Sequence, residues 1–162
     1  MKIKIATAPS RKARAWKNET WEWVDLVNRC RETVRTGETM AEYVRMGKND
    51  QSERKDVGGF VGGYLDGGRR RNGHVRLRSV ATLDIDHGRA DVWDDFTLNF
   101  VCAAFLYSTH KHTEKSPRYR LVIPFDRECE PWEYEPVCRR IAETLGIDLF
   151  DHTTYALPRL FY

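Results

Sequence analysis

The segment Leu83-Asp84-Ile85-Asp86 constrains the fold more than any other part of the chain. It follows an apolar run and alternates apolar with acidic residues, which is the period of a β-strand. Residues i and i+2 of a strand point to the same face, about 6.5–7 Å apart. We therefore expect a strand that buries Leu83 and Ile85 and presents the Asp84 and Asp86 carboxylates together, close enough to share one or two divalent ions.

Two later segments add polar groups. In Tyr107-Ser108-Thr109-His110 the strand period places Ser108 and His110 on one face. Asp151 stands alone beside a pair of threonines. Each feature has an ordinary explanation, since Asp-x-Asp can end a strand in solvent and a lone aspartate can cap a turn. Together the three acids fit hard oxygen ligands for Mg²⁺ or Mn²⁺.

The remaining candidates suit a polyphosphate. Arg120 and Arg159 could neutralise a triphosphate through planar, bidentate donors, or pair with an acid at the edge of the core. His110 is a candidate base, zinc ligand or phosphate contact. Zinc is disfavoured because the nearby acids prefer harder ions and no cysteine motif accompanies the histidine.

Apolar periodicity divides the chain into helices and strands. We expect helices at 21–34, 40–46, 92–99 and 131–145, and a polar loop at 48–57. Strands are expected around residues 3–5 and at 75–85, 101–110, 118–125 and 155–162. This order predicts an α+β fold in which helices cover one side of a mostly antiparallel sheet.

Strand parity predicts a sheet with two different faces. The side chains expected on the apolar face are those of Leu83, Ile85, Phe105, Tyr107, Tyr119, Leu121, Ile123 and Phe125. The side chains expected on the opposite face are those of Thr82, Asp84, Asp86, Ser108, His110, Arg118 and Arg120, with Leu106 and Val122 as apolar exceptions. We therefore expect one open face to present every candidate polar group of the strands.

Length and charge set broad limits. The 162 residues correspond to one domain, and we expect 1–162 to be a piece of a longer chain. With 27 Lys and Arg against 24 Asp and Glu, the net charge of +3 permits nucleic-acid binding without requiring it. Basic residues cluster between Arg69 and Arg78 and between Lys111 and Arg120, where they could contact phosphates or form a solvated face.

The cysteines and the hydropathy exclude other classes of protein. Four cysteines show no C-x-x-C spacing, which disfavours a zinc site or disulfide framework and suits a reducing cytoplasm. The charged N-terminus does not match a signal peptide, and no stretch reaches the roughly 18–20 apolar residues that cross a bilayer. We expect a cytoplasmic protein with no membrane partner.

In this order the motifs resemble the archaeo-eukaryotic primase superfamily. They are most similar to the primase-polymerase domains of phages, plasmids and mobile elements, often fused to virulence-associated or poxvirus-type helicases. The hydrophobic-Asp-hydrophobic-Asp motif is matched by Asp84 and Asp86, small-x-His by Ser108 and His110, and the lone acid by Asp151. Three ordered motifs are far more specific than one.

The resemblance implies an RRM-like sheet beside a small N-terminal α/β unit. It implies two-metal nucleotidyl transfer, with Asp84, Asp86 and Asp151 as catalytic ligands of Mg²⁺ or Mn²⁺ and with Ser108 and His110 on the nucleotide phosphates. Arg120 and Arg159 are assigned to the nucleotide site by their charge and strand parity and not by a family motif. The implied partners are a single-stranded DNA template, nucleoside triphosphates and a replicative helicase in cis or in trans.

Two other functions stay open. His110-x-His112 together with Tyr155 superficially matches the metal site and tyrosine nucleophile of a rolling-circle replication nuclease. Lys111, however, stands where that motif needs a bulky apolar residue. A nucleic-acid-binding module could also keep a primase fold without turnover.

Overall fold

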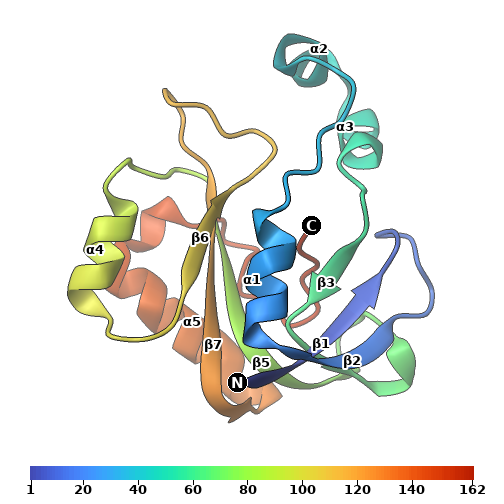
Figure 1. Cartoon of the computed structure of the whole chain (residues 1–162), viewed down its shortest axis with the longest axis vertical. Coiled ribbons are helices and arrows are strands. Elements are labelled where there is room, and N and C mark those ends of the chain that lie inside the picture. The colour runs from blue at the N-terminus through green and yellow to red at the C-terminus, as the bar shows by residue number, and fades with distance from the viewer.

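Two antiparallel sheets and the helices around them make up the structure, a computed structural model that describes residues 1–162 (Figure 1). The strands are β1 (Lys2–Ala8), β2 (Lys17–Glu22), β3 (Gly59–Val61), β4 (Gly63–Leu65), β5 (Val75–Ile85), β6 (Phe105–Ser108) and β7 (Tyr119–Cys129). The helices are α1 (Trp23–Arg31), α2 (Met40–Arg45), α3 (Lys48–Arg54), η1 (Asp66–Gly68), α4 (Val92–Asn99), α5 (Pro131–Leu145) and η2 (Ile147–Leu149). The α+β class predicted from the sequence is confirmed.

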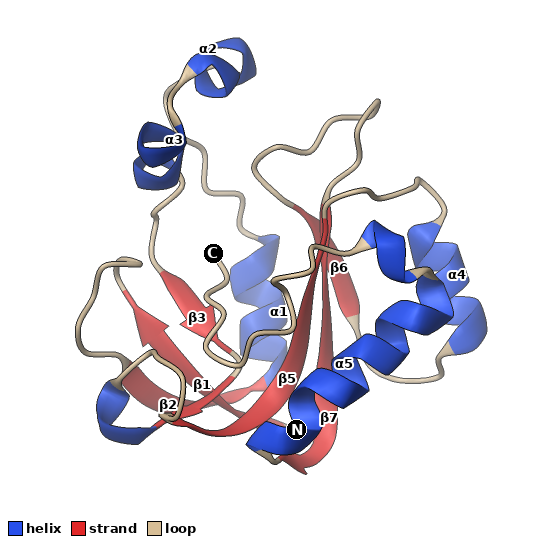
Figure 2. Cartoon of the chain, turned by 180° about the vertical axis from the view of Figure 1, so that it is seen from behind, coloured by secondary structure: helices blue, strands red, loops and turns tan.

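The main sheet has the strand order β4-β5-β7-β6, and α4 and α5 cover one of its faces (Figure 2). Leu83 and Ile85 of β5 and Leu121 and Ile123 of β7 pack there against the helices, as their parity predicts. Helix α5 begins at Pro131 after a capping box and stops at Gly146, whose φ of 101° an L-residue rarely adopts. These local signals explain why its bounds were predictable.

A smaller N-terminal unit lies against the other face. Its sheet has the order β2-β1-β3, and helix α1 follows β2 directly. Apolar side chains of both units share one core: Ile3, Ile5, Leu26, Phe60, Val80, Val122 and Phe161. Because β5 and β7 contribute to this core and to the core under α5, β5 is buried along almost its whole length.

Arg78 belongs to the interior, although the sequence placed it in a basic cluster that could contact phosphates. Its side chain is fully buried, and its guanidinium donates to the carbonyl oxygens of Gly62, Val80 and Leu157 at 3.0, 3.1 and 2.6 Å. The same group lies 4.0 Å from the centre of the Tyr134 ring. Arg78 therefore ties β5 to its neighbours and is not a phosphate contact.

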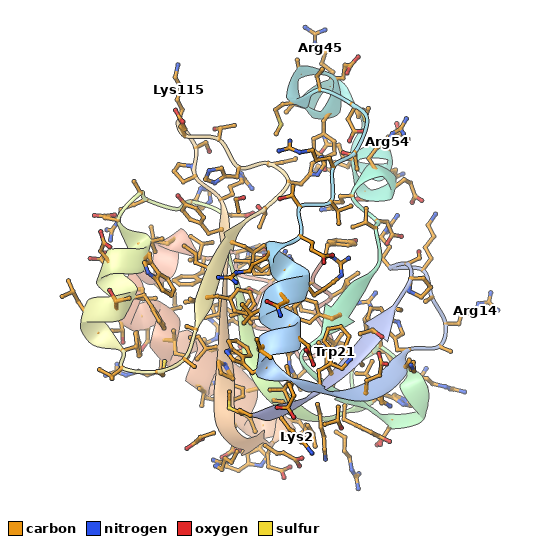
Figure 3. All side chains as sticks on the ribbon, viewed as in Figure 1. Lys2, Arg14, Trp21, Arg45, Arg54 and Lys115 are labelled. Atoms are coloured by element: carbon orange, nitrogen blue, oxygen red, sulfur yellow. The ribbon has the colours of Figure 1, made fainter.

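The segment 32–58, called the strap here, leaves α1, carries α2 and α3, and returns to β3 (Figure 1). Its two helices stand away from the sheets, at the same end of the molecule as the loop between β6 and β7. Figure 3 labels Arg45 and Arg54 on these helices and Lys115 on that loop. None of the helices in the structure is long and apolar enough to span a membrane.

Two expected elements were wrong and two have other bounds: the helix expected at 21–34 is α1, and the strand expected at 101–110 is β6. The polar segment 48–57 contains α3, which buries no residue and therefore has no apolar stripe that could reveal it. Residues 17–22 form β2, which pairs with β1 and shortens the helix expected at 21–34. The segment 155–162 contains no strand; only Phe161 bridges to Phe60, through two hydrogen bonds of 2.8 and 2.9 Å.

Candidate active site

One cleft of about 1980 Å³ brings the predicted site residues to a common surface. The main sheet, α1 and the strap supply its walls. All seven predicted residues line it: Asp84, Asp86, Ser108, His110, Arg120, Asp151 and Arg159. Residues as far apart in sequence as Asp84 and Arg159 therefore meet in space.

Asp84 is the most enclosed acid of the cleft. It lies near the end of β5 opposite Arg120 of β7, and only 6% of its surface is exposed. Its Oδ1 accepts a hydrogen bond of 2.7 Å from Arg120 Nε, and its Oδ2 lies 3.2 Å from Arg159 Nη2. Its backbone N–H donates to the Thr154 hydroxyl at 2.8 Å. The carboxylate is therefore held from two sides by positive charge.

Asp151 lies directly beside Asp84. Its backbone N–H donates to the Asp84 carbonyl oxygen at 3.0 Å, and its Oδ2 accepts from Arg159 Nη2 at 2.8 Å. The N–H and hydroxyl of Thr153 also donate to the Asp151 carboxylate. Burial alone would raise the pKa of Asp151, but the Thr153 hydrogen bonds and the Arg159 charge outweigh it and lower the pKa below its usual value.

Asp84 and Asp151 offer the kind of oxygen donors that the divalent cation implied by the resemblance prefers. Oδ2 of Asp84 and Oδ2 of Asp151 both contact Nη2 of Arg159, so one positive charge already stands between two hard oxygen donors. Asp86 stands apart, because its Oδ1 pairs with Arg118 Nη1 at 3.0 Å. No three His, Cys, Asp or Glu side chains converge as the chain is arranged. Asp84 and Asp151 thus fit a cation that replaces the Arg159 contact, and a third ligand requires Asp86 to leave Arg118.

Arg120 is a partner of Asp84 and not a free cation in the cleft. Its Nη1 donates to the Tyr107 hydroxyl at 2.9 Å and to the Tyr162 carbonyl oxygen at 3.0 Å. Burial lowers the pKa of Arg120, but Tyr107 and Asp84 raise it by more, so the guanidinium stays charged. Burial also raises the pKa of Tyr107 to about 12, which keeps the phenol neutral.

The predicted parity of β6 is reversed in the structure. Tyr107 pairs with Arg120 in the register of the sheet, whereas Ser108 pairs with Tyr119, on the face of the helix-covered core. The reason is that β6 is covered on both sides: the Phe105 ring packs on Trp23 at an angle of 45°, while Leu106 packs toward α4 and α5. Ser108 therefore lies at the rim of the cleft, and Tyr107 takes the position beside Asp84 and Arg120.

His110 follows β6 and lies under the strap. Its Nε2 is 3.6 Å from Glu38 Oε1, and its ring packs on Tyr43 with 4.2 Å between ring centres. Burial lowers the pKa of His110 below 6.5, the Glu38 carboxylate opposes this shift, and Lys55 and Lys111 reinforce it. The imidazole is therefore mainly neutral in the free protein near pH 7.

Sequence reasoning missed Tyr107, Glu38 and Tyr43 as members of the site. Tyr107 was assigned to the wrong face because β6 has apolar residues at both parities. The capping box of α2, in which Thr39 pairs with Glu42, marks where that helix starts. No periodicity connects the preceding residue, Glu38, to a histidine that follows β6, so its contact has no local signal.

Comparison with known proteins identifies a family. The family model described as "VapE N-terminal domain" matches residues 1–162. A solved structure, the AEP domain of the primase-polymerase of cyanophage S-2L, aligns with a TM-score of 0.48 at 15% identity, over 99% of this chain and 70% of that one. No curated protein matches. The family match agrees with the resemblance to primase-polymerase domains of the virulence-associated type, and the chain belongs to the VapE N-terminal domain family.

Proposed function

We propose that this domain is a primase-polymerase that joins nucleotides on a single-stranded DNA template and releases pyrophosphate. The observation that supports this most strongly is the meeting of Asp84 and Asp151 around one positive charge, in a cleft that also contains His110. Nucleotidyl transfer needs carboxylates that hold cations beside groups that hold a triphosphate.

Asp84, Asp151 and Asp86 are the residues that would hold Mg²⁺ or Mn²⁺ in a two-metal site. When bound, these ions supply the Lewis-acid chemistry that activates an attacking hydroxyl and stabilises the leaving pyrophosphate. Arg120 orients the Asp84 carboxylate, because its Nε donates to Oδ1 while its Nη1 is fixed by the Tyr107 hydroxyl and the Tyr162 carbonyl oxygen.

The phosphates of the incoming nucleotide would lie between His110 and Arg159. Arg159 is half-buried and can exchange its contacts with Asp84 and Asp151 for a phosphate, to which a planar guanidinium binds through two donors. Ser108, at the rim, is the outermost of the proposed nucleotide-binding groups. The basic lining of the cleft favours a polyanionic template.

The family name describes an N-terminal domain, and we propose that residues 1–162 act as the catalytic domain of a longer chain. A replicative helicase, in cis or in trans, would then deliver the single-stranded template.

Nothing in the structure favours the nuclease alternative. Tyr155 is buried against α5, where Arg139 lies 4.4 Å from the centre of its ring. It does not line the cleft that contains His110. Nδ1 of His112 is occupied by the backbone N–H of Arg118 at 3.1 Å. A tyrosine nucleophile and a two-histidine metal site are therefore not brought together.

The proposal is tested by incubating the chain with a single-stranded oligonucleotide, labelled nucleoside triphosphates and Mn²⁺ or Mg²⁺. We expect template-dependent incorporation that Asp84→Ala and Asp86→Ala abolish. The exposed Asp126→Ala on β7 serves as the matched control and should leave incorporation unchanged. Undiminished synthesis by the Asp84 and Asp86 variants would refute the proposal. A covalent protein–DNA adduct would favour the nuclease, and oligonucleotide binding without metal-dependent nucleotide affinity would favour the non-catalytic module.

A further inference from the structure

The strap places two side chains on His110 that belong to none of the sequence motifs. Oε1 of Glu38 lies 3.6 Å from Nε2 of His110, and the Tyr43 ring packs on the imidazole at an angle of 53°. Tyr43 is itself buried, and its hydroxyl donates to the Gln51 carbonyl oxygen at 3.2 Å. The strap therefore contacts the small-x-His motif of the main sheet through Glu38 and Tyr43.

Glu38 is held in place but is not satisfied. Its Oε1 accepts a hydrogen bond of 2.8 Å from the Thr36 hydroxyl, and only 6% of its side chain is exposed. Its Oε2 is buried without any hydrogen-bond partner. A buried carboxylate oxygen that accepts no hydrogen bond costs free energy unless another state of the protein supplies compensating positive charge. The positive charges that act on this carboxylate are those of Arg54 and His110, and of the two only His110 can gain or lose its proton near neutral pH.

Four ionisable groups surround the imidazole. Glu38 and Tyr43 approach from the strap, Lys55 from the end of the strap and Lys111 from the next residue. The two lysines disfavour a proton on His110 and the glutamate favours one. A polyphosphate that entered the cleft would neutralise the lysine charges, which shifts the balance toward imidazolium.

We propose that Glu38 is a positioning residue for His110, and that it stabilises the imidazolium that forms when a triphosphate binds. Nucleotide binding then takes up one proton from solvent onto the free ring nitrogen of His110, and no covalent bond forms or breaks. The other ring nitrogen faces Glu38, so the protonated ring donates to the carboxylate on one side and to phosphate on the other. This inference rests on the proposed function, because it assigns a partner to the proposed phosphate contact.

Proton uptake distinguishes the two possible roles of Glu38, because a purely structural role would leave the number of protons taken up unchanged. Nucleoside triphosphate binding is measured by isothermal titration at pH 7.5 in buffers of different ionisation enthalpy, which gives the number of protons taken up. Glu38→Gln keeps the size and the hydrogen-bonding oxygen but removes the charge. We expect it to lower proton uptake by at least half and to weaken nucleotide binding about tenfold. Glu143→Gln, on the exposed side of α5 and outside the cleft, is the matched control and should change neither.

A second measurement on the free protein separates this inference from the proposed function. The His110 Cε1 proton is followed by NMR against pH in the wild type and in both variants. We expect Glu38→Gln to move the His110 titration to lower pH, and Glu143→Gln to leave it unchanged. Identical titrations and identical proton uptake in the Glu38 variant would overturn the inference. If the wild type binds no triphosphate, the proposed function fails, and the NMR titration alone still decides whether Glu38 controls the charge on His110.

Discussion

The side chain of Asp84 shows how one residue connects stability with the proposed chemistry. Its two oxygens contact two different guanidinium groups, and the Arg120 side chain that holds Oδ1 is only 9% exposed. Removal of one partner from a buried ion pair leaves an uncompensated charge in a low-dielectric site, which costs far more than the pair itself contributes. The pair therefore constrains which variants of the cleft can fold.

We predict that Arg120→Met destabilises the protein by about 3–5 kcal/mol, because it leaves Asp84 buried with only the contact from Arg159. Urea denaturation followed by circular dichroism measures the change. Adding Asp84→Asn to this variant should recover part of the loss. A loss below about 1 kcal/mol would mean that Asp84 is solvated in a way that the structure does not show.

Arg159 competes with cations at the same place. Its Nη2 stands between Oδ2 of Asp84 and Oδ2 of Asp151, so Arg159→Gln removes a resident positive charge. We predict that this variant binds Mn²⁺ about tenfold more tightly in the absence of nucleotide. Isothermal titration with MnCl₂ is the measurement, with the exposed Arg140→Gln on α5 as control. Unchanged or weaker Mn²⁺ binding would place the cation elsewhere in the cleft.

At the scale of elements, strong local signals decided what could be predicted. The bounds of β5, α4 and α5 agree with the residues expected from apolar periodicity and capping, because each element buries a continuous face. Helix α3 has no buried face, and the segment after Tyr155 is fixed by contacts with β3 rather than by its own period. Helix α3 therefore has no periodic signal, and the apolar residues of 155–162 predict a strand that does not form.

The site was predictable to a similar degree. Asp84, His110 and Asp151 were identified from motifs and do line one cleft. The sequence could not show that Tyr107, and not Ser108, lies beside Arg120, because β6 has apolar side chains on both faces. The charge of Arg120 was compatible with a phosphate contact or with an ion pair at the edge of the core. The pairing of β5 with β7, which places Arg120 opposite Asp84, decides for the ion pair.

The C-terminal segment is held as part of the N-terminal unit's core. Phe161 is fully buried, exchanges two backbone hydrogen bonds with Phe60, and lies 4.8 Å from the Arg120 guanidinium. We predict that Phe161→Ala lowers the free energy of unfolding by about 3–5 kcal/mol, from lost burial and the cavity that remains. Thermal or urea denaturation measures it. Val137→Ala, on the exposed side of α5, should cost much less, and an equal loss in both variants would argue against the docking of this segment.

At the scale of the whole molecule, the cleft exists because the strap spans from the N-terminal unit to the β6–β7 loop. Arginine and lysine side chains from both units line it: Arg11, Arg29, Arg31, Arg35, Lys55, Arg70, Lys111, Arg118, Arg120 and Arg159. A net charge of +3 does not reveal this concentration of positive charge, since it depends on how the chain folds. The cleft is therefore the surface where we expect single-stranded DNA to bind.

This placement predicts salt-dependent template binding. The association constant for a single-stranded oligonucleotide, from fluorescence anisotropy, should fall linearly with salt on logarithmic axes. Loss of one phosphate contact should reduce the slope by about 0.7. Lys111→Gln, in the cleft, should show this reduction, whereas Lys115→Gln, at the tip of the same loop and outside the cleft, should not (Figure 3). Equal slopes for both variants would move the DNA path away from the cleft.

The central claim is that Asp84 and its neighbours hold a divalent cation that in turn holds a nucleoside triphosphate. The most direct measurement is isothermal titration of ribo- and deoxynucleoside triphosphates into the chain, with and without Mn²⁺, for the wild type, Asp84→Asn and the exposed control Asp94→Asn on α4. We predict that Mn²⁺ strengthens nucleotide binding at least about tenfold in the wild type and the control, and that Asp84→Asn loses this gain. Mn²⁺-dependent nucleotide binding that survives in Asp84→Asn would contradict it.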